Sequence, residues 1–330
     1  MTAVAASRSR GRRTSSPSRS LGYSQLLTLR EFGKTQTDDR CLRGCGRRIR
    51  RGDVGDADEI LETTVYCHRA WLCPVCGYRA RRRQSRGLAQ TLMAWTSQGG
   101  SLAVLTLTQR HSPDDELDNL WDRLEDGWDA MVRGSGWRAD RKSFGVRGYA
   151  RITEVVHHPE SGWNVHFHVP LLLDDELDDQ QLYELQDRVT ARFTRGIGDA
   201  GGRASCGGQD LGPIQPGSER RRAGYYAKGT TVWRSETGRG GGRRPGGRRG
   251  ADLVGSRTPM AILADLKETG EGLGLWKEFS AAVTRIKRRR YSPSQGIATL
   301  LRERNDVSSM PTESLSVPTT TSSAALGTIT

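Results

Sequence analysis

The stretch Gly162-Trp163-Asn164-Val165-His166-Phe167-His168-Val169 decides how the chain is expected to fold. It is an apolar run with two histidines, and its length and β-branched residues are typical of a buried strand. Side chains alternate between the faces of a strand, so His166 and His168 share one face and their apolar neighbours share the other. Two imidazoles on one rigid face can hold a divalent cation where a phosphate could reach it. The alternative is that both histidines are polar residues of a solvated face.

A third ligand for such a cation is expected on the preceding strand. Glu154 lies in an otherwise apolar segment, where an unpaired carboxylate would be costly. Pairing Val156 with Trp163 across the connecting turn would leave Glu154 one residue out of register with the histidines. A bulge or an asymmetric turn would be needed to bring it opposite His166. The alternative is that Glu154 is a solvated strand residue.

A possible nucleophile follows in the segment Gly224-Tyr225-Tyr226-Ala227-Lys228. On a helix Tyr225 and Lys228 lie on one face, whereas Tyr226 points about 100° away, so only one tyrosine can face the metal. A tyrosine hydroxyl is a poor nucleophile at neutral pH, and a nearby cation can activate it. The pattern favours phosphodiester chemistry, with Tyr225 as nucleophile and Lys228 binding the phosphate, stabilising the phenolate or positioning the metal. The alternative is a core tyrosine beside a solvated lysine.

Five of the six cysteines lie between residues 41 and 76, namely Cys41, Cys45, Cys67, Cys73 and Cys76. In a reducing cytosol such a cluster indicates a metal rather than disulfides. The knuckle Cys73-Pro74-Val75-Cys76 is typical of zinc sites, and tetrahedral zinc takes four ligands. Cys73 and Cys76 are therefore expected to bind zinc together with two of the other three cysteines. Four protein ligands leave no position for water, which would make this zinc structural.

The net charge of +13 and the pI near 9.9 favour a polyanionic partner, because phosphate neutralisation dominates nucleic-acid affinity. Basic runs at 81–83, 220–222 and 287–290 are candidate phosphate contacts. The longest apolar runs, Leu102–Leu107 and Val169–Leu173, are far too short to span a bilayer. Residues 1–20 lack the apolar core of a secretory signal. We therefore expect a cytoplasmic protein that binds DNA and does not contact a membrane.

The order of expected elements, β-α-ββ-α-β-α, predicts an α/β sandwich of the α+β type, with a mainly antiparallel sheet and packed helices. Expected strands cover 102–108, 149–156, 163–173 and 210–215. A helix is expected to begin at Ser112-Pro113, another to carry Leu182 to Phe193, and one or two more to lie within 259–287. His111 could face the metal site, whereas His157 and His158 are expected in a solvated turn. Composition divides the chain into a disordered basic arm (1–39), a zinc-binding cysteine module with the start of a basic helix (40–86), a main domain (87–233), a Gly/Arg linker (234–252), a C-terminal helical segment (253–304) and a disordered tail (305–330).

These motifs together resemble the rolling-circle replication initiators of the HUH endonuclease superfamily, and most closely the Rep proteins of actinobacterial plasmids. Three motifs match in order: the strand Leu105-Thr106-Leu107-Thr108, His-hydrophobic-His at 166–168, and Tyr-x-x-Lys at 225–228. The segments Cys67-x5-Cys73-Pro74-Val75-Cys76 and Arg257-Thr258-Pro259 are also similar to these proteins. The resemblance covers about residues 40–300.

The resemblance implies an HUH endonuclease-like fold over 87–233, in which His166, His168 and Glu154 bind Mg²⁺ or Mn²⁺. Tyr225 would nick one strand of a plasmid double-strand origin at an exposed single-stranded site, and Tyr226 is a second hydroxyl within reach of the motif. The products would be a 5′-phosphotyrosine link and a free 3′-OH, with a host helicase and polymerase as partners. A relaxase or transposase with the same chemistry is one alternative, although relaxases typically place their tyrosine near the N-terminus. The other is a zinc-dependent DNA-binding regulator without catalysis.

Overall fold

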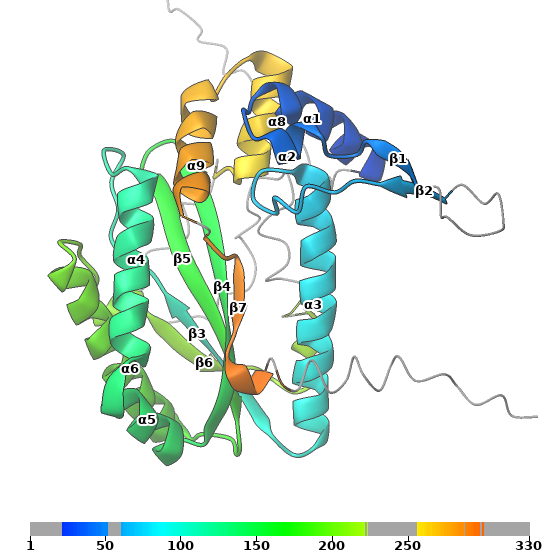
Figure 1. The fold of residues 1–330 in the computed structure, drawn as a ribbon. Helices are drawn as coiled ribbons and strands as arrows, with labels where there is room; N and C mark the ends of the chain where they lie inside the picture. The colour runs from blue at the N-terminus through cyan, green and yellow to red at the C-terminus, as the bar shows by residue number, and fades with distance from the viewer. Residues whose placement is uncertain are drawn as a thin grey trace, which may run out of the picture.

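A five-stranded antiparallel sheet with helices on both faces forms the centre of the molecule (Figure 1). The computed structural model describes residues 22–51, 61–221, 223, 256–286, 288–297 and 299. The strand order is β6-β3-β5-β4-β7. The strands are β3 (Ser101–Leu107), β4 (Val146–His158), β5 (Gly162–Leu173), β6 (Asp210–Pro213) and β7 (Tyr291–Pro293). The predicted α+β class with a mainly antiparallel sheet is therefore confirmed.

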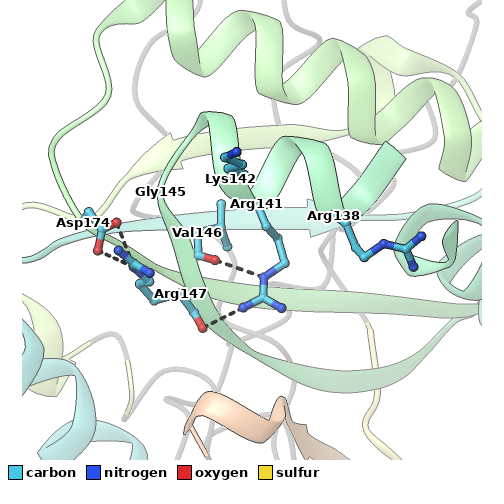
Figure 2. A pocket seen from close by; sticks show the side chains of 7 residues that line it. All are labelled: Arg138, Arg141, Lys142, Gly145, Val146, Arg147 and Asp174. Carbon is cyan, nitrogen blue, oxygen red and sulfur yellow. Dashed lines mark hydrogen bonds and ion pairs between the residues drawn. The ribbon is translucent and has the colours of Figure 1, made fainter. Parts of the chain in front are cut away.

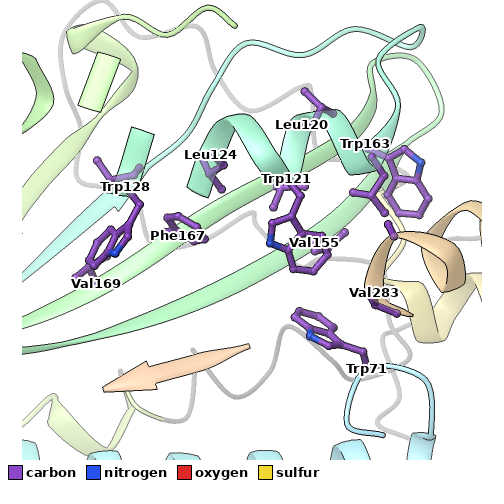
Figure 3. Packing of buried hydrophobic residues seen from close by; sticks show 14 of the residues in the cluster. Trp71, Leu120, Trp121, Leu124, Trp128, Val155, Trp163, Phe167, Val169 and Val283 are labelled. Carbon is purple, nitrogen blue, oxygen red and sulfur yellow. The ribbon is translucent and has the colours of Figure 1, made fainter. Parts of the chain in front are cut away.

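Helices α4 (Leu117–Val132) and α6 (Asp179–Asp199) cover one face of the sheet, and α5 (Gly134–Ser143) packs against β4. The apolar side of β5 lies in this layer, where the ring centroid of Phe167 is 5.9 Å from that of Trp128 on α4 (Figure 3). Val165, Phe167 and Val169 are all buried there. The alternation predicted for this strand therefore places its apolar residues in the core and turns its histidines to the other face.

The long helix α3 (Pro74–Ser97) covers the histidine face of the sheet. Leu88 and Leu92 belong to the same buried apolar cluster as Ile152 of β4 and Leu172 of β5. The helix begins at Pro74, because the cysteine knuckle forms its first turn and Cys73 is its N-cap. The expected boundary between residues 86 and 87 falls inside this helix, so the cysteine module and the main domain share it. None of the described helices is long and apolar enough to cross a membrane.

A layer of short elements from both ends of the chain packs above the sheet and α3 (Figure 1). It contains α1 (Tyr23–Thr35), α2 (Arg40–Arg43), β1 (Arg48–Arg51), β2 (Leu61–Thr64), α8 (Pro259–Thr269) and α9 (Leu273–Arg285). The expected disordered arm, residues 1–39, is wrong for α1, because Leu26 and Leu29 are buried. Where one or two helices were expected within 259–287, the structure has two, α8 and α9. Residues 1–21, the linker 234–252 and the tail 305–330 lie outside the described residues.

Tertiary contacts shift several boundaries away from the sequence expectation. Helix α4 begins at Leu117 rather than at Ser112-Pro113, because Ser112 instead closes a turn by donating its backbone N–H to Asp115 (2.9 Å). The backbone N–H of Leu117 donates to Glu278 Oε1 of α9 at 2.8 Å, a cap supplied from 161 residues away. Helix α5, the hairpin of β1 and β2, and the edge strand β7 were not predicted.

His157 and His158 belong to β4 and not to a solvated turn. Only residues 159–161 connect β4 to β5, His158 is buried, and the ring of His157 lies 5.0 Å from that of Trp163. The backbone of His157 exchanges two hydrogen bonds with Arg257, of 2.8 and 2.9 Å. Burial, and then the charge of Arg257, lower the pKa of His157 from 6.5 to about 4.

This depressed pKa predicts a specific loss of stability in acid. The unfolded chain takes up a proton near pH 6.5 and the folded chain only near pH 4, so stability falls as the pH drops between these values. Since the ring is half-buried, we expect about 1 kcal/mol of destabilisation from this group between pH 7 and pH 5. Denaturant unfolding of His157→Phe should show a pH dependence smaller by that amount. Equal pH dependence in both proteins would contradict the assignment.

Candidate metal centre and basic helix

The register of the β4–β5 hairpin brings the three predicted metal ligands together. Val156 pairs with Asn164, not with Trp163, and Glu154 therefore lies directly opposite His166. The three-residue connection produces this shift, and no bulge is present at this part of the hairpin. Directly paired residues of an antiparallel ladder point to the same face. The register problem raised by the sequence is thus resolved by the turn.

The carboxylate of Glu154 bridges the two histidines. Its Oε2 atom is 2.9 Å from Nε2 of His166 and 3.0 Å from Nε2 of His168. The three side chains are only 12–18% exposed, and their ligand atoms all lie within 4.8 Å of one another. Two imidazole nitrogens and one carboxylate oxygen form a donor set that divalent metals accept. We call these three residues the His–Glu cluster.

The cluster favours the protonation state that metal binding requires. Burial acts to raise the pKa of Glu154, but hydrogen bonds with His166 and His168 hold it well below its usual range. Burial lowers the pKa of His168. An ionised carboxylate beside a neutral imidazole can donate lone pairs to a cation without first losing protons.

Residues around the cluster orient it or lie apart from it. The Oγ1 atom of Thr106, on the neighbouring strand β3, is 3.4 Å from Nδ1 of His168 and can fix the orientation of that ring. His111, which could have faced the metal site, instead places its Nδ1 2.7 Å from the carbonyl oxygen of Ser161 in the hairpin turn. His111 is not among the residues that the structure gathers in the His–Glu cluster.

Four of the five clustered cysteines converge at the N-terminus of α3. The sulfurs of Cys45, Cys67, Cys73 and Cys76 lie within 4.8 Å of one another, with Cys45 3.8 Å from Cys73 and 3.6 Å from Cys76. Tetrahedral zinc with bonds of about 2.3 Å places its sulfurs about 3.8 Å apart, so the set fits zinc. Cys41 is exposed and lies outside this set. Hydrogen bonds from Cys67 and Cys73 lower the pKa of Cys76, which favours the thiolate that zinc binds.

Helix α3 presents a basic outer surface next to the cysteine cluster. Its sequence contains no acidic residue, and its exposed arginines are Arg79, Arg82, Arg83 and Arg86. The guanidinium carbon of Arg79 lies 4.1 Å from the ring centroid of Tyr66, and that of Arg82 lies 5.6 Å from that of Tyr78. These contacts hold two of the cations in place at the surface. The surface suits a polyanionic partner.

The other basic runs are only partly available as phosphate contacts. Arg288 is buried and pairs with Asp118 and Asp122 of α4, so it is a core ion pair and the expectation for this position is wrong. Arg220 and Arg221 are exposed. Arg222 and Lys287 lie outside the described residues.

A second basic region lies at the far end of β4 from the His–Glu cluster. Figure 2 shows a pocket of about 330 Å³ lined by Arg138, Arg141, Lys142, Gly145, Val146, Arg147 and Asp174. Arg147 already pairs with Asp174 at 2.7 Å, and Arg141 donates to two backbone carbonyl oxygens. The pocket has none of the nucleophiles or metal ligands discussed above, so it adds to the cationic surface rather than to the candidate catalytic site.

Tyr225, Tyr226 and Lys228 lie outside the described residues. The last described residue before them is Ala223, which is buried in the same apolar cluster as Ile152. The hydroxyl of Ser85 on α3 donates to the carbonyl oxygen of Ala223 at 3.0 Å. Ile152 pairs with His168 across the hairpin, so Ala223 lies on the histidine face of the sheet.

Sequence reasoning missed Thr106 as a ring-orienting residue, because it stood in a quoted motif without a role. Arg81 and Arg290 stood within basic runs that were candidate phosphate contacts, but their burial was not expected. No sequence signal distinguishes these two arginines from their exposed neighbours.

Comparison with known proteins shows what the central segment resembles. Residues 58–193 match the model of a family described as replication protein. This segment is similar to replication proteins. It contains the His–Glu cluster, all of α3 and three of the four converging cysteines. No solved structure matches the chain.

Three curated proteins are similar to parts of this chain. The chain is 28% identical to a neomycin resistance protein of Streptomyces cyanogenus, over 66% of this chain and 64% of that protein. It is 27% identical to a protein rep of Streptomyces lividans, over 32% of this chain and 29% of that protein. It is 30% identical to a protein rep of Staphylococcus aureus, over 29% of this chain and 41% of that protein. The chain thus spans less than two thirds of the length of each of these relatives.

Proposed function

We propose that this protein initiates plasmid replication by nicking one DNA strand at the replication origin. The observation that carries this proposal is the His–Glu cluster, in which Glu154 Oε2 lies 2.9 and 3.0 Å from the two histidine nitrogens. The cluster stands on the two central strands of the sheet, inside the segment that matches replication proteins. The same motifs favour an HUH endonuclease-like domain. A cytoplasmic location is part of the proposal.

His166, His168 and Glu154 would hold Mg²⁺ or Mn²⁺. Such an ion, when bound, polarises the scissile phosphate and acts as a template for it. The residues themselves fix the site: β4 and β5 are paired along most of their length, so the ligands are held on a rigid ladder. Their low exposure limits competition from water.

Tyr225 would attack the phosphate as the nucleophile. Its phenolic oxygen forms a bond to phosphorus while the bond from phosphorus to the 3′ oxygen breaks, and that oxygen leaves with a proton as a free 3′-OH. The resulting 5′-phosphotyrosine link conserves the bond energy for later strand closure. Ala223, two residues before Tyr225, is held on the histidine face. Because two residues of extended chain span at most about 7 Å, this contact limits the distance between Tyr225 and that face. Lys228 would neutralise the phosphate or the phenolate.

The four converging cysteines would bind a structural zinc ion, and α3 would present its exposed arginines to the DNA. Because the zinc ligands form the first turn of α3, zinc would fix the direction of this basic helix. A host helicase and a host polymerase would then act on the nicked strand and its free 3′-OH.

A nicking assay on supercoiled DNA that carries the protein's own replicon tests this function. We expect open-circular product and covalently attached protein with Mn²⁺ or Mg²⁺, and neither product in EDTA, because the proposed centre needs a bound ion to polarise the scissile phosphate. Tight DNA binding without cleavage under any of these metals would instead support a zinc-dependent regulator.

A matched pair of variants separates the cluster from general charge effects. Glu154→Gln removes the buried carboxylate, whereas Glu160→Gln removes an exposed one in the hairpin turn. We expect the first change to lower the nicking rate by about 10- to 100-fold, the range seen when metal-site residues are altered, and the second to leave it unchanged. Equal nicking rates in both variants would show that Glu154 is not a metal ligand of the nicking centre.

A further inference from the structure

Arg81 is a buried cation on the inner side of α3. Its residue exposure is 5%, although it is flanked in the sequence by exposed arginines. No described carboxylate forms an ion pair with Arg81. The charged or titratable side chains that affect its pKa are Arg290 and Tyr78. Burying a guanidinium without an anion is costly. A residue that lowers stability in this way is a candidate for a binding role.

The chain makes room for Arg81 with a glycine one turn earlier. A Cβ atom at Gly77 would lie 2.6 Å from Nη1 of Arg81 and 2.5 Å from the carbonyl oxygen of Ala70. Any larger residue at this position would therefore push the guanidinium away from the loop before the cysteine knuckle. The small residue at position 77 is therefore needed for Arg81 to occupy this position.

A second buried arginine, Arg290, contacts the loop that precedes the cysteine knuckle. Arg290 is 6% exposed, and its guanidinium carbon lies 5.6 Å from the ring centroid of Trp71, the residue after Ala70. Its carbonyl oxygen accepts from the backbone N–H of Thr153 at 2.8 Å, beside Glu154. Two buried arginines therefore lie near the loop that precedes the cysteine knuckle, Arg290 against Trp71 and Arg81 close to Gly77.

The electrostatics of the two arginines also indicate a binding role. Burial, and then the charge of Arg290, lower the pKa of Arg81 well below its ordinary value. The charges of Arg290 and Glu154 attract each other. Glu154 is already shared by two histidines. Arg81 therefore adds buried positive charge next to Arg290, whose charge interacts with Glu154 of the His–Glu cluster, and a bound anion would neutralise it.

We propose that Arg81 and Arg290 form a phosphate subsite that binds a backbone phosphate of single-stranded DNA beside the His–Glu cluster. Arg81 and Ser85 are four residues apart on one face of α3, and Ser85 holds Ala223. Arg81 is therefore about one helical turn from the contact between Ser85 and Ala223. Guanidinium groups bind phosphate oxygens through paired, charge-assisted hydrogen bonds. This inference names the ligand subsite of the proposed nicking centre and rests on that function.

The test measures binding of a fluorescent single-stranded oligonucleotide to the full chain by anisotropy, without added Mg²⁺ or Mn²⁺, over a range of KCl concentrations. Arg81→Met is compared with Arg195→Met, which removes the same charge from an exposed position on α6, across the sheet. We expect Arg81→Met to weaken binding by about 10- to 100-fold and to reduce the slope of log affinity against log salt by about 0.7. Arg195→Met should change neither quantity. Equal affinity and slope for Arg81→Met and the wild type would overturn the subsite.

A second measurement separates binding from a structural role. Removing a buried cation that lacks an ion pair should leave the melting temperature of the free protein unchanged or raise it. A clear fall would identify Arg81 as a structural residue and would overturn the inference. Arg81→Lys, which keeps the charge but loses the planar fork, should bind DNA with intermediate affinity. Because binding is measured without cleavage, the subsite can fail while nicking stands, and nicking can fail while the subsite stands.

Discussion

Replacing Tyr225 with phenylalanine should abolish strand cleavage and leave DNA affinity nearly unchanged. The variant lacks only the hydroxyl that attacks phosphorus, and loss of a covalent nucleophile lowers rates by about 10⁴-fold or more. The measurement is the initial rate of nicking on supercoiled origin DNA, followed by a denaturing gel for protein attached to DNA. Binding of the same DNA serves as the check that the variant is folded.

Tyr226→Phe is the natural control for this experiment. It changes the adjacent residue by the same single atom, and on a helix its side chain points about 100° away from that of Tyr225. We expect this variant to nick at the wild-type rate and to form the adduct. Cleavage that survives in Tyr225→Phe and disappears in Tyr226→Phe would exchange the roles of the two residues.

Replacing Cys73 with serine should release zinc and destabilise the whole N-terminal layer. Cys73 both belongs to the converging sulfurs and caps α3, and zinc in such small modules supplies much of the folding free energy. We expect zinc content to fall from one equivalent to near zero. The melting temperature should fall by more than about 10 °C, given about 2–4 °C for each kcal/mol lost in a chain of this size.

Cys41→Ser provides the matched control, because Cys41 is exposed and lies outside the converging set. This variant should keep its zinc and its melting temperature. Loss of zinc from Cys41→Ser, with zinc retained in Cys73→Ser, would contradict the grouping of sulfurs in the structure. It would also reassign the fourth ligand among the clustered cysteines.

Much of the candidate site could be predicted because it depends on local periodicity. The alternation along β5 is a property of any strand, so the shared face of His166 and His168 followed directly from the sequence. The register of Glu154 did not, because it depends on a three-residue turn whose length cannot be read until both strand ends are known. In the same way, spacing identified the zinc knuckle but could not choose among Cys41, Cys45 and Cys67.

The features that escaped prediction depend on distant contacts. Helix α1 has a weak apolar pattern and becomes ordered where Gly33 packs against α8, so closely that a Cβ atom at this glycine would lie 3.4 Å from the side chain of Leu263. The start of α4 is set by Glu278 from another helix. The burial of Arg81 depends on Gly77 and on a loop that folds back over α3. These contacts leave no local signal that distinguishes the residues from their neighbours.

The three-residue connection between β4 and β5 makes the protein unusually sensitive to small insertions and deletions at one exposed place. Substitutions at residues 159–161 should be tolerated, since Pro159 and Glu160 are exposed. Removing one residue, however, would shift the ladder by one position and exchange the two faces of β5. Phe167 and Val169 would then face the cation site, and both histidines would enter the apolar core. Insertions or deletions of two residues in this loop are therefore expected to be tolerated better than changes of one residue, because only even changes keep the histidines on the same face.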